Sequence, residues 1–127
     1  MTGGITGFQK AYKVSEAVPQ YRGVIFDKED FCKLPTADNQ VPLGVVFNDE
    51  QLRVGMPVSV AFDRYVEIEA EGTITAGDEI ILATGGTCLN TSGLVAGTAA
   101  NLLGYAENSG VKGDIITVRV ERKVVIK

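Results

Sequence analysis

A repeated pattern of glycine followed by apolar residues most constrains the fold of this chain. It occurs as VGMPVSV at residues 54–60, as AGDEIIL at 76–82 and as KGDIITV at 112–118. In each copy a glycine turn, which tolerates positive φ, leads into β-branched residues that favour strands. The chain also repeats LGVVFN of residues 43–48 as LGYAEN at 103–108. These repeats predict short strands that re-enter a sheet after tight corners.

Strand-like apolar runs fill most of the chain around these corners. They lie at residues 22–26, 43–47, 58–62, 65–70, 79–83, 87–90, 102–106, 115–120 and 121–127. Strands this short, with corners every ten to fifteen residues or so, are typical of all-β domains. We therefore expect an all-β fold, either a small closed or half-closed β-barrel or a sandwich of short strands with glycine turns.

Two pairs of neighbouring runs predict hairpins. Residues 79–83 and 87–90 flank a Thr-Gly-Gly turn, whose glycines tolerate the backbone of a tight corner. Residues 58–62 and 65–70 flank an Asp-Arg link, which is not the favoured turn pair. The residues 65–70 alternate in period two, so Val66 is expected to be buried with Ile68 while the intervening glutamates face solvent.

Helix signals are few, and at most one or two short helices are expected. Residues 28–34 predict a helix of about two turns, with Asp27 as its N-cap and Pro35 as its stop. Residues 1–20 show no firm period, and we expect them to form a flexible N-terminal arm that orders on a partner. Residues 21–127 are then expected to form a single β-rich domain, because 127 residues support one compact core.

Composition argues against most kinds of enzyme. The chain has no histidine, the commonest general base and metal ligand. Three glutamates, Glu67, Glu69 and Glu71, are close in sequence. They are expected to lie together on one face in solvent, so they do not predict the pair of catalytic carboxylates of a glycosidase. Asp78 and Asp114 follow turn glycines and are expected to accept hydrogen bonds from nearby backbone amides. We therefore expect no enzymatic activity, no cofactor and no bound metal.

Charge and hydropathy exclude two classes of partner. Twelve basic residues against sixteen acidic ones give a formal charge of −4, which argues against a nucleic-acid-binding surface. Residues 35–90 hold nine acidic and two basic residues, a net charge of −7, which predicts an acidic face. No apolar stretch approaches the length of a membrane span, so no membrane partner is expected. Cys32 and Cys88 are expected to be reduced, buried thiols.

The order of the short motifs resembles the capsid decoration, or cement, proteins of tailed bacteriophages. The resemblance rests on VPLGVV at residues 41–46, VGMPVSV at 54–60, GTITAGD at 72–78, LGYA at 103–106 and GDIITV at 113–118. It implies a small β-rich protein, often a homotrimer, which binds the major capsid protein at local three-fold positions on the outer surface of the phage head. It also implies a protein that stabilises the capsid lattice and resides in the host cytoplasm before assembly.

The same resemblance implies that the N-terminal segment reaches the shell. The apolar residues of that segment, and hence the predicted capsid contacts, are Ile5, Phe8, Tyr12 and Val14. The alternative is a non-enzymatic β-barrel binding module, either tail-associated or similar to biotinyl and lipoyl carrier domains. A carrier needs an exposed lysine at a hairpin tip, and no lysine occurs between Lys33 and Lys112.

Overall fold

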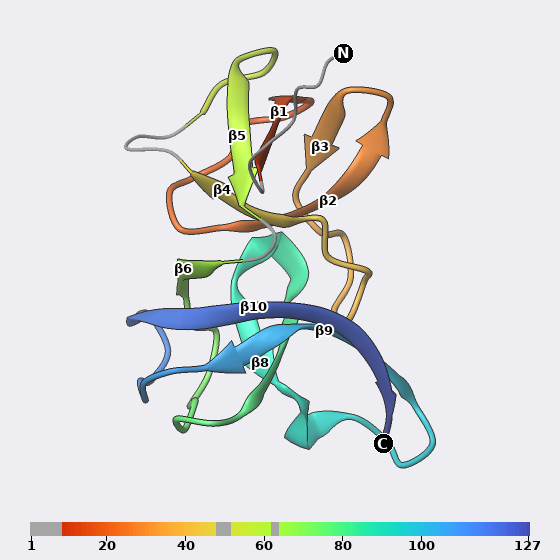
Figure 1. The fold of residues 1–127 in the computed structure, drawn as a ribbon, viewed down its shortest axis with the longest axis vertical. Helices are drawn as coiled ribbons and strands as arrows, with labels where there is room; N and C mark the ends of the chain where they lie inside the picture. Colours follow the sequence, from red (N-terminus) through yellow and green to blue (C-terminus); the bar gives the residue numbers. More distant parts are fainter. Residues whose placement is uncertain (1–8, 48–51, 62–63) are drawn as a thin grey trace.

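The computed structural model describes residues 9–47, 52–61 and 64–127, which form strands joined by tight turns. The strands are β1 (Gln9–Val14), β2 (Gly23–Lys28), β3 (Phe31–Lys33), β4 (Gly44–Phe47), β5 (Pro57–Ala61), β6 (Tyr65–Glu69), β7 (Glu79–Leu82), β8 (Cys88–Asn90), β9 (Ala99–Ala106) and β10 (Ile115–Ile126). The helical elements of these ranges are two 3-10 turns, η1 (Thr84–Gly86) and η2 (Thr91–Gly93). The all-β prediction is confirmed. The strands form two units stacked along the long axis of the molecule (Figure 1).

The first unit is a closed barrel with strand order β1-β3-β2-β4-β5. It closes because β5 pairs with β1 along its whole length, antiparallel, while β1 pairs with β3 in parallel. Alternate side chains fill its interior, as the pleat of a strand requires. The buried residues of this interior are Val14, Val18, Val24, Cys32, Val46, Leu52, Val58 and Val60.

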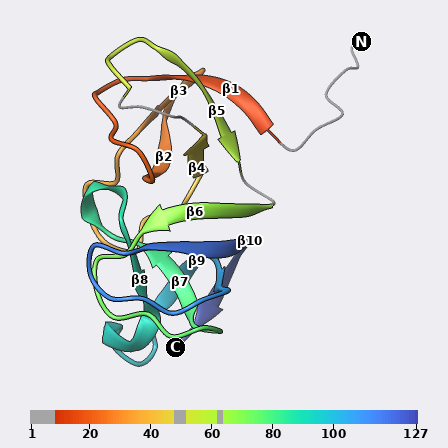
Figure 2. The ribbon, with the colours of Figure 1, turned by 90° about the vertical axis from the view of Figure 1, so that its left-hand side faces the viewer.

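The second unit is a five-stranded sheet with the order β6-β10-β9-β7-β8. Its two outer strands approach each other, and a single parallel bridge joins Ala70, directly after β6, to Cys88 of β8. This sheet is therefore also curved almost into a barrel, which lies below the first in Figure 2. The predicted hairpin around η1 is confirmed, since Leu82 of β7 pairs with Cys88 of β8.

The two units are copies of one strand arrangement. The strands β1, β2, β3, β4 and β5 correspond to β6, β7, β8, β9 and β10, and they pair in the same order. Their registers also correspond: Val14↔Cys32 matches Ala70↔Cys88, Phe26↔Cys32 matches Leu82↔Cys88, and Val46↔Val60 matches Ala106↔Val118. The repeats seen in the sequence are thus parts of a duplication that spans nearly the whole described chain.

Glycine turns fix the corners of both units. Gly55, Gly77 and Gly113 have φ of 83°, 92° and 93°, a region that L side chains rarely adopt. Each glycine is the third residue of a turn whose fourth residue donates its backbone N–H to the carbonyl oxygen of the first. The repeated glycine pattern in the sequence is therefore a repeated backbone requirement.

The aspartates after these glycines act within the turns, as predicted. Asp78 Oδ2 accepts a hydrogen bond from the N–H of Thr75 at 2.8 Å, and Asp114 Oδ2 accepts one from the N–H of Val111 at 2.9 Å. In both turns the aspartate side chain thus adds a hydrogen bond across the turn, beside the bond between backbone groups. These carboxylates are thus structural.

The repeated Leu-Gly pairs have a different cause. A Cβ atom at Gly44 would overlap the carbonyl oxygen of Ala61, and one at Gly104 would overlap that of Arg119. In both units, then, the strand passes so close to the backbone of its neighbour that only glycine fits.

The two units share a core and pack as one body. Three apolar side chains of the first barrel, Ile25, Val45 and Ala61, belong to the same buried cluster as the interior of the second unit. The second unit supplies its other members, which are Val66, Ile68, Ala70, Ile74, Ile80, Leu82, Cys88, Leu103, Ala106, Ile116, Val118 and Val120. Burial of Val66 and Ile68 confirms the face predicted from the alternation of residues 65–70.

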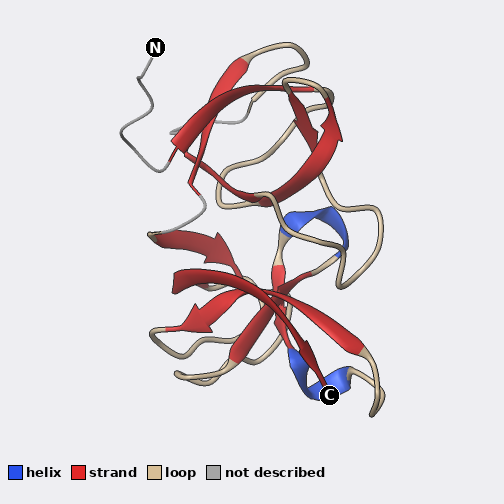
Figure 3. Cartoon of the chain, turned by 45° about the vertical axis from the view of Figure 1, so that its right-hand side comes forward, coloured by secondary structure: helices blue, strands red, loops and turns tan. Residues whose placement is uncertain are grey.

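Polar contacts also join the units. Asn39, in the connection between β3 and β4, donates its backbone N–H to Leu82 O and its Nδ2 to Ala99 O, both at 2.9 Å. Its Oδ1 accepts the backbone N–H of Asn101 at 2.8 Å. Its φ is 67°, which asparagine tolerates better than most residues. The turn η1, the upper of the two helical segments in Figure 3, is also bound to this connection, because the Gly85 N–H donates to Pro35 O at 2.9 Å.

Two local predictions are wrong. Residues 28–34 do not form a helix; Asp30, with φ of 65°, makes the tight turn between β2 and β3. A helix of two turns has little stability of its own, and here the ladder that buries Cys32 prevails. The strands β5 and β6 do not form a hairpin either, because β5 belongs to the first barrel and β6 to the second unit. Of the link between them, Asp63 lies outside the described residues.

The segment expected as an arm is part of the barrel from Gln9 onward. Strand β1 pairs with two neighbours, and Val18 beyond it forms a bridge with Leu52. Residues 1–8 lie outside the described residues. The predicted boundary at residue 20 therefore falls inside the first barrel rather than ahead of it.

Candidate functional site

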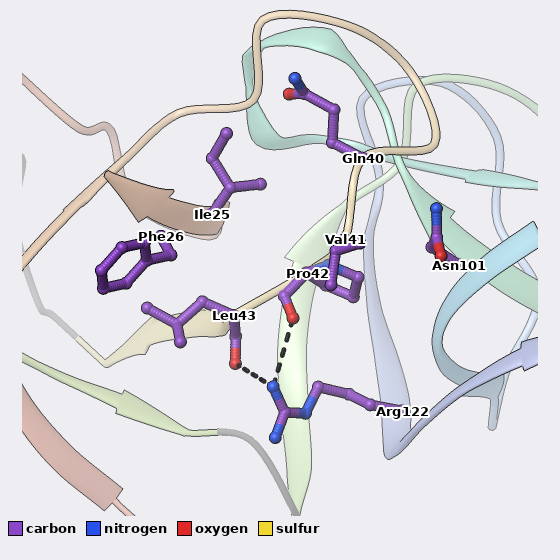
Figure 4. A pocket seen from close by; sticks show the side chains of 8 residues that line it. All are labelled: Ile25, Phe26, Gln40, Val41, Pro42, Leu43, Asn101 and Arg122. Carbon is purple, nitrogen blue, oxygen red and sulfur yellow. Dashed lines mark hydrogen bonds between the residues drawn. The ribbon is translucent and has the colours of Figure 1, made fainter. Parts of the chain in front are cut away.

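A surface groove lies where the two units meet. One wall is formed by Ile25 and Phe26 of β2 and by the connection at residues 40–43, and the other by Asn101 of β9 and Arg122 of β10. The groove has a volume of about 520 Å³. Figure 4 shows the apolar side chains of the first wall pointing toward it, with Arg122 below them. The groove is thus an apolar hollow with one cationic group.

Arg122 is positioned by an irregularity in β10. The register of β10 against β9 shifts between Val120 and Lys123, which places Arg122 beside the first barrel. Its Nη1 donates to Pro42 O and to Leu43 O, both at 3.3 Å (Figure 4). The guanidinium therefore holds the loop at residues 40–43 against the second unit.

A second hollow continues the groove along β10. It has a volume of about 260 Å³, and Val41, Leu102, Lys123 and Val124 are among the residues that line it. Val41 is 68% exposed and Val124 61% exposed, and Ile126, two residues further along β10, is 70% exposed. Adjacent exposed aliphatic side chains of this kind are typical of interaction surfaces.

The sequence-predicted capsid contacts do not lie in this groove. Tyr12 is half-buried against the interior of the first barrel, and Val14 is fully buried within it. Ile5 and Phe8 lie outside the described residues. Within the described chain, then, Tyr12 and Val14 have core positions.

The glutamates of β6 and the following residue are partnered or exposed. Glu67 is exposed, Glu69 lies 3.4 Å from a guanidinium nitrogen of Arg22, and Glu71 lies 3.2 Å from Lys112 Nζ. The predicted solvent face is thus confirmed for Glu67, whereas Glu69 and Glu71 are half-buried and ion-paired, which the alternation does not predict.

The two cysteines occupy matching interior positions and are poorly reactive. Both Cys32 and Cys88 are fully buried, as predicted. Burial, with a smaller contribution from Asp27, raises the pKa of the Cys32 thiol to about 11, and burial raises the pKa of Cys88 to about 12. Since the thiolate is the nucleophile, neither thiol is suited to covalent chemistry near neutral pH.

Over residues 9–47, 52–61 and 64–127, no group of three acidic or cysteine side chains is arranged to hold a metal ion. Nor does this part of the chain contain a helix long and apolar enough to cross a bilayer.

No local pattern in the sequence predicts the groove. Its walls come from residues around 41 and around 122, which are brought together only by the stacking of the two units. One signal was available: residues 122–126 alternate Arg, Val and Ile at every second position in a run that ends a long strand. Such alternation marks a face, but it does not show whether that face is buried.

These features define a class of molecule, a duplicated β-barrel protein whose most distinctive surface is a groove without reactive groups. No protein-family model matches the chain, and no curated protein matches it. Among solved structures, it is similar to the N base of head fiber gp8.5 in bacteriophage phi29. The two chains are 20% identical and superpose with a TM-score of 0.68 over 94% of this chain and 98% of the other. The likeness shows a shared fold.

Proposed function

We propose that this chain is a structural protein of a bacteriophage head and that it binds the outer surface of the capsid shell. The observation that carries the proposal is the fold, which the chain shares over nearly its whole length with the base of a phage head fiber. The motif order of residues 41–118 supports it, since it resembles capsid decoration proteins. Attachment to a shell requires complementary surface and rigidity rather than chemistry, and buried thiols and ion-paired carboxylates are compatible with that.

In the finer form of this proposal the protein is a cement. It would bind the major capsid protein at local three-fold positions as a homotrimer and stabilise the lattice, after residing in the host cytoplasm before assembly. Three linked copies would bind far more tightly than one, because linkage raises the effective concentration and can add a factor of about 10²–10⁴.

A second candidate is the base of a head fiber, which the name of the structural neighbour favours. A cement stabilises the shell, whereas a fiber base attaches another part to it. The two differ in their effect on the shell. Decorated shells should resist heat or low salt better than bare shells if the protein is a cement, and should be unchanged if it is only a base.

Sedimentation with shells tests the common part of both forms. Matured heads that lack the protein are mixed with the purified chain and pelleted, with immature shells and shell-free tubes as controls. The chain should pellet with matured heads and reach saturation. If it stays in the supernatant at every concentration tried, the chain is not a head protein. The remaining candidate is then the non-enzymatic β-barrel binding module, either tail-associated or carrier-like.

The oligomer is tested by mass in solution. A trimer should have three times the chain mass of 13.5 kDa by native mass spectrometry or sedimentation equilibrium. A dimer would contradict the trimer directly. If a monomer is found, the same measurement is made on protein chemically cross-linked on the shell, where a ladder that stops below three copies contradicts it as well.

The N-terminal contact is tested by a deletion that spares β1. Removing residues 2–8 takes away Ile5 and Phe8 but leaves the barrel from Gln9 onward. The truncated chain should unfold at the same denaturant concentration as the parent and bind matured heads more weakly. Equal binding would show that attachment lies elsewhere on the molecule.

A further inference from the structure

The groove lies on a part of the first barrel that has a counterpart in the second unit. Gly44 pairs with Val24 just as Gly104 pairs with Ile80, so the residues before the two glycines correspond one to one. The matching registers of β2 and β7 relate a third groove residue to the second unit. The groove residues and their counterparts are Phe26 with Leu82, Val41 with Asn101, and Leu43 with Leu103.

In the second unit the counterpart surface holds the first barrel. Leu82 and Leu103 are fully buried, in the cluster that also contains side chains of the first barrel. Leu82 packs so closely there that a Cβ atom at Gly23 would overlap its side chain. Asn101 donates its backbone N–H to Asn39 Oδ1 of the first barrel at 2.8 Å. This surface is therefore a docking site, and the first barrel occupies it.

On the first barrel the same positions are open to solvent. Phe26 is 57% exposed and Val41 is 68% exposed, while Leu43 is half-buried against the barrel interior. Figure 4 shows the three side chains around one hollow. Neighbouring apolar side chains in solvent, at positions that the second unit buries, indicate a docking site for another protein.

The docked face of the first barrel indicates what such a site accepts. Gly23 pairs with Val45, and Val45 pairs with Ala61, so the three residues form one row across the barrel wall. The row is buried against the second unit rather than in the barrel interior. Its side chains are small or absent, which lets the wall approach the docking surface closely. The matching partner of the groove is therefore a sheet face with small apolar side chains.

A second copy of this chain does not match that description. The row of small residues in the first barrel is already buried within each molecule. The corresponding row of the second unit consists of Glu79, Tyr105 and Arg119, whose side chains are large and polar. The two rows therefore favour a different protein as the partner.

We propose that the groove formed by Phe26, Val41 and Leu43 binds the outer face of a β-sheet of the shell protein, where that face carries small apolar side chains. This inference rests on the proposed function and names the surface through which the shell is bound. The first barrel and the second unit already contact each other in this way, so the chain would use one mode of packing twice.

The chain enters the first barrel at the same end as the groove. Strands β1 and β4 both run antiparallel to β5, so they run in the same direction. Gln9 therefore begins β1 at the end of the barrel where Leu43 leads into β4. The predicted capsid contacts Ile5 and Phe8 precede Gln9 in the chain. Contact with the shell through these residues is thus compatible with contact through the groove.

The first test changes the side chain at position 26. Phe26→Leu introduces the residue type found at the corresponding position of the second unit, and it should bind matured heads as the parent does. Phe26→Ser removes the apolar side chain from the groove. It should bind about tenfold more weakly in pelleting titrations, because truncating an aromatic side chain at the centre of an interface has at least this effect. Equal binding of Phe26→Ser and the parent would overturn the inference.

The second test places a charge in the groove without changing a buried side chain. Val41→Lys should bind matured heads about tenfold more weakly, because an ammonium group loses hydration in an apolar contact. Val54→Lys is the matched control, since Val54 is 69% exposed but lies at the other end of the barrel. There the N–H of Gly55 donates to Val14 O, at the end of β1, at 2.8 Å. Equal binding of the two variants would contradict the proposed site.

The third test identifies the chemistry of the partner. A photoreactive benzophenone is attached to Val124→Cys, in the hollow that continues the groove, while both native thiols are fully buried. On matured heads it should cross-link to a strand of the shell protein with glycine, alanine or valine at alternate positions. Val54→Cys, labelled in the same way, should give no such product. Cross-links to a helix or to a charged loop would overturn the proposed sheet face.

The outcomes separate this inference from the proposed function. If the parent chain fails to pellet with heads, the proposed function and the inference fail together. If the parent, Phe26→Ser and Val41→Lys pellet equally, the function stands and the groove is not the attachment surface.

Two other occupants of the groove give results of their own. If Val41→Lys lowers the mass of the chain in solution, a second copy occupies the groove, which overturns the inference. If deletion of residues 2–8 accelerates maleimide labelling of Val41→Cys but not of Val54→Cys, the segment before β1 occupies it, which overturns the inference as well. Unchanged mass and unchanged labelling support the shell as the partner.

Discussion

Tyr21 and Gly77 occupy the same position in the two copies of the fold. The Val46 N–H donates to Arg22 O at 3.1 Å just as the Ala106 N–H donates to Asp78 O at 2.9 Å, so the residues before the two acceptors correspond. Both have positive φ, 60° for Tyr21 and 92° for Gly77. In the first copy this backbone conformation is adopted by Tyr21, although it is unfavourable for an L-amino acid with a side chain. In the second copy it is adopted by Gly77, for which it costs little.

The cost of that backbone conformation can be measured at Gly77. A Cβ at this position meets no atom within 4 Å, so Gly77→Ala changes the backbone preference alone. We expect it to lower the free energy of unfolding by about 1 kcal/mol, as measured by urea denaturation. Gly93→Ala, at an equally open site without positive φ, is the control and should have a smaller effect. Equal losses would contradict the strain argument.

Glu79 should make stability depend on pH. A hydrogen bond from Lys127 Nζ lowers the pKa of Glu79 from its usual 4.5, a hydrogen bond from Thr91 also lowers it, and partial burial opposes them. A carboxylate with a lowered pKa in the folded state stabilises the fold above its unfolded pKa, and this stabilisation is lost as pH falls through the folded value. Glu79→Gln should therefore destabilise the chain at pH 7 and much less at pH 3, by denaturant titration. A loss of the same size at both values would contradict this.

At the scale of elements, strand positions could be predicted and strand partners could not. Glycine corners and alternation are local, so the strands and the hairpin around η1 follow from the sequence. Alternation shows which face of a strand is buried but not which strand lies beside it. For that reason the predicted hairpin of β5 and β6 is wrong. No helix forms at residues 28–34, because the ladder of β3 with β1 and β2 outweighs a weak local preference. The groove could not be predicted, since its walls come from distant segments.

The connection between β3 and β4 depends on Asn39. Asn39→Ala removes two hydrogen bonds to β9 and places alanine at a φ of 67°. We expect a loss of about 2 kcal/mol in the free energy of unfolding. Asn39→Gly loses the same bonds but tolerates the backbone, so it should cost about 1 kcal/mol. If the Asn39→Gly variant is no more stable than the Asn39→Ala variant in a denaturant titration, the positive φ at Asn39 does not contribute to the loss of stability.

At the scale of the whole molecule, the duplication suggests two domains that fold independently. The shared core indicates instead that the two units fold together. Ile25, Val45 and Ala61 of the first barrel are buried in the cluster that fills the second unit. We therefore expect a single unfolding transition, with equal calorimetric and van 't Hoff enthalpies and coincident curves by circular dichroism and tyrosine fluorescence. Two resolved heat-capacity peaks would show that the units are independent.

The stacking of the units along one axis also has a geometric consequence. Strand β1 belongs to the upper unit in Figure 1, while the end of β10 lies at the opposite pole. Fluorescent dyes attached near these two poles would sit at different heights above any surface that the molecule stands on. Energy transfer to an acceptor in that surface would then reveal which pole points down, and so give the polarity of the molecule on its support.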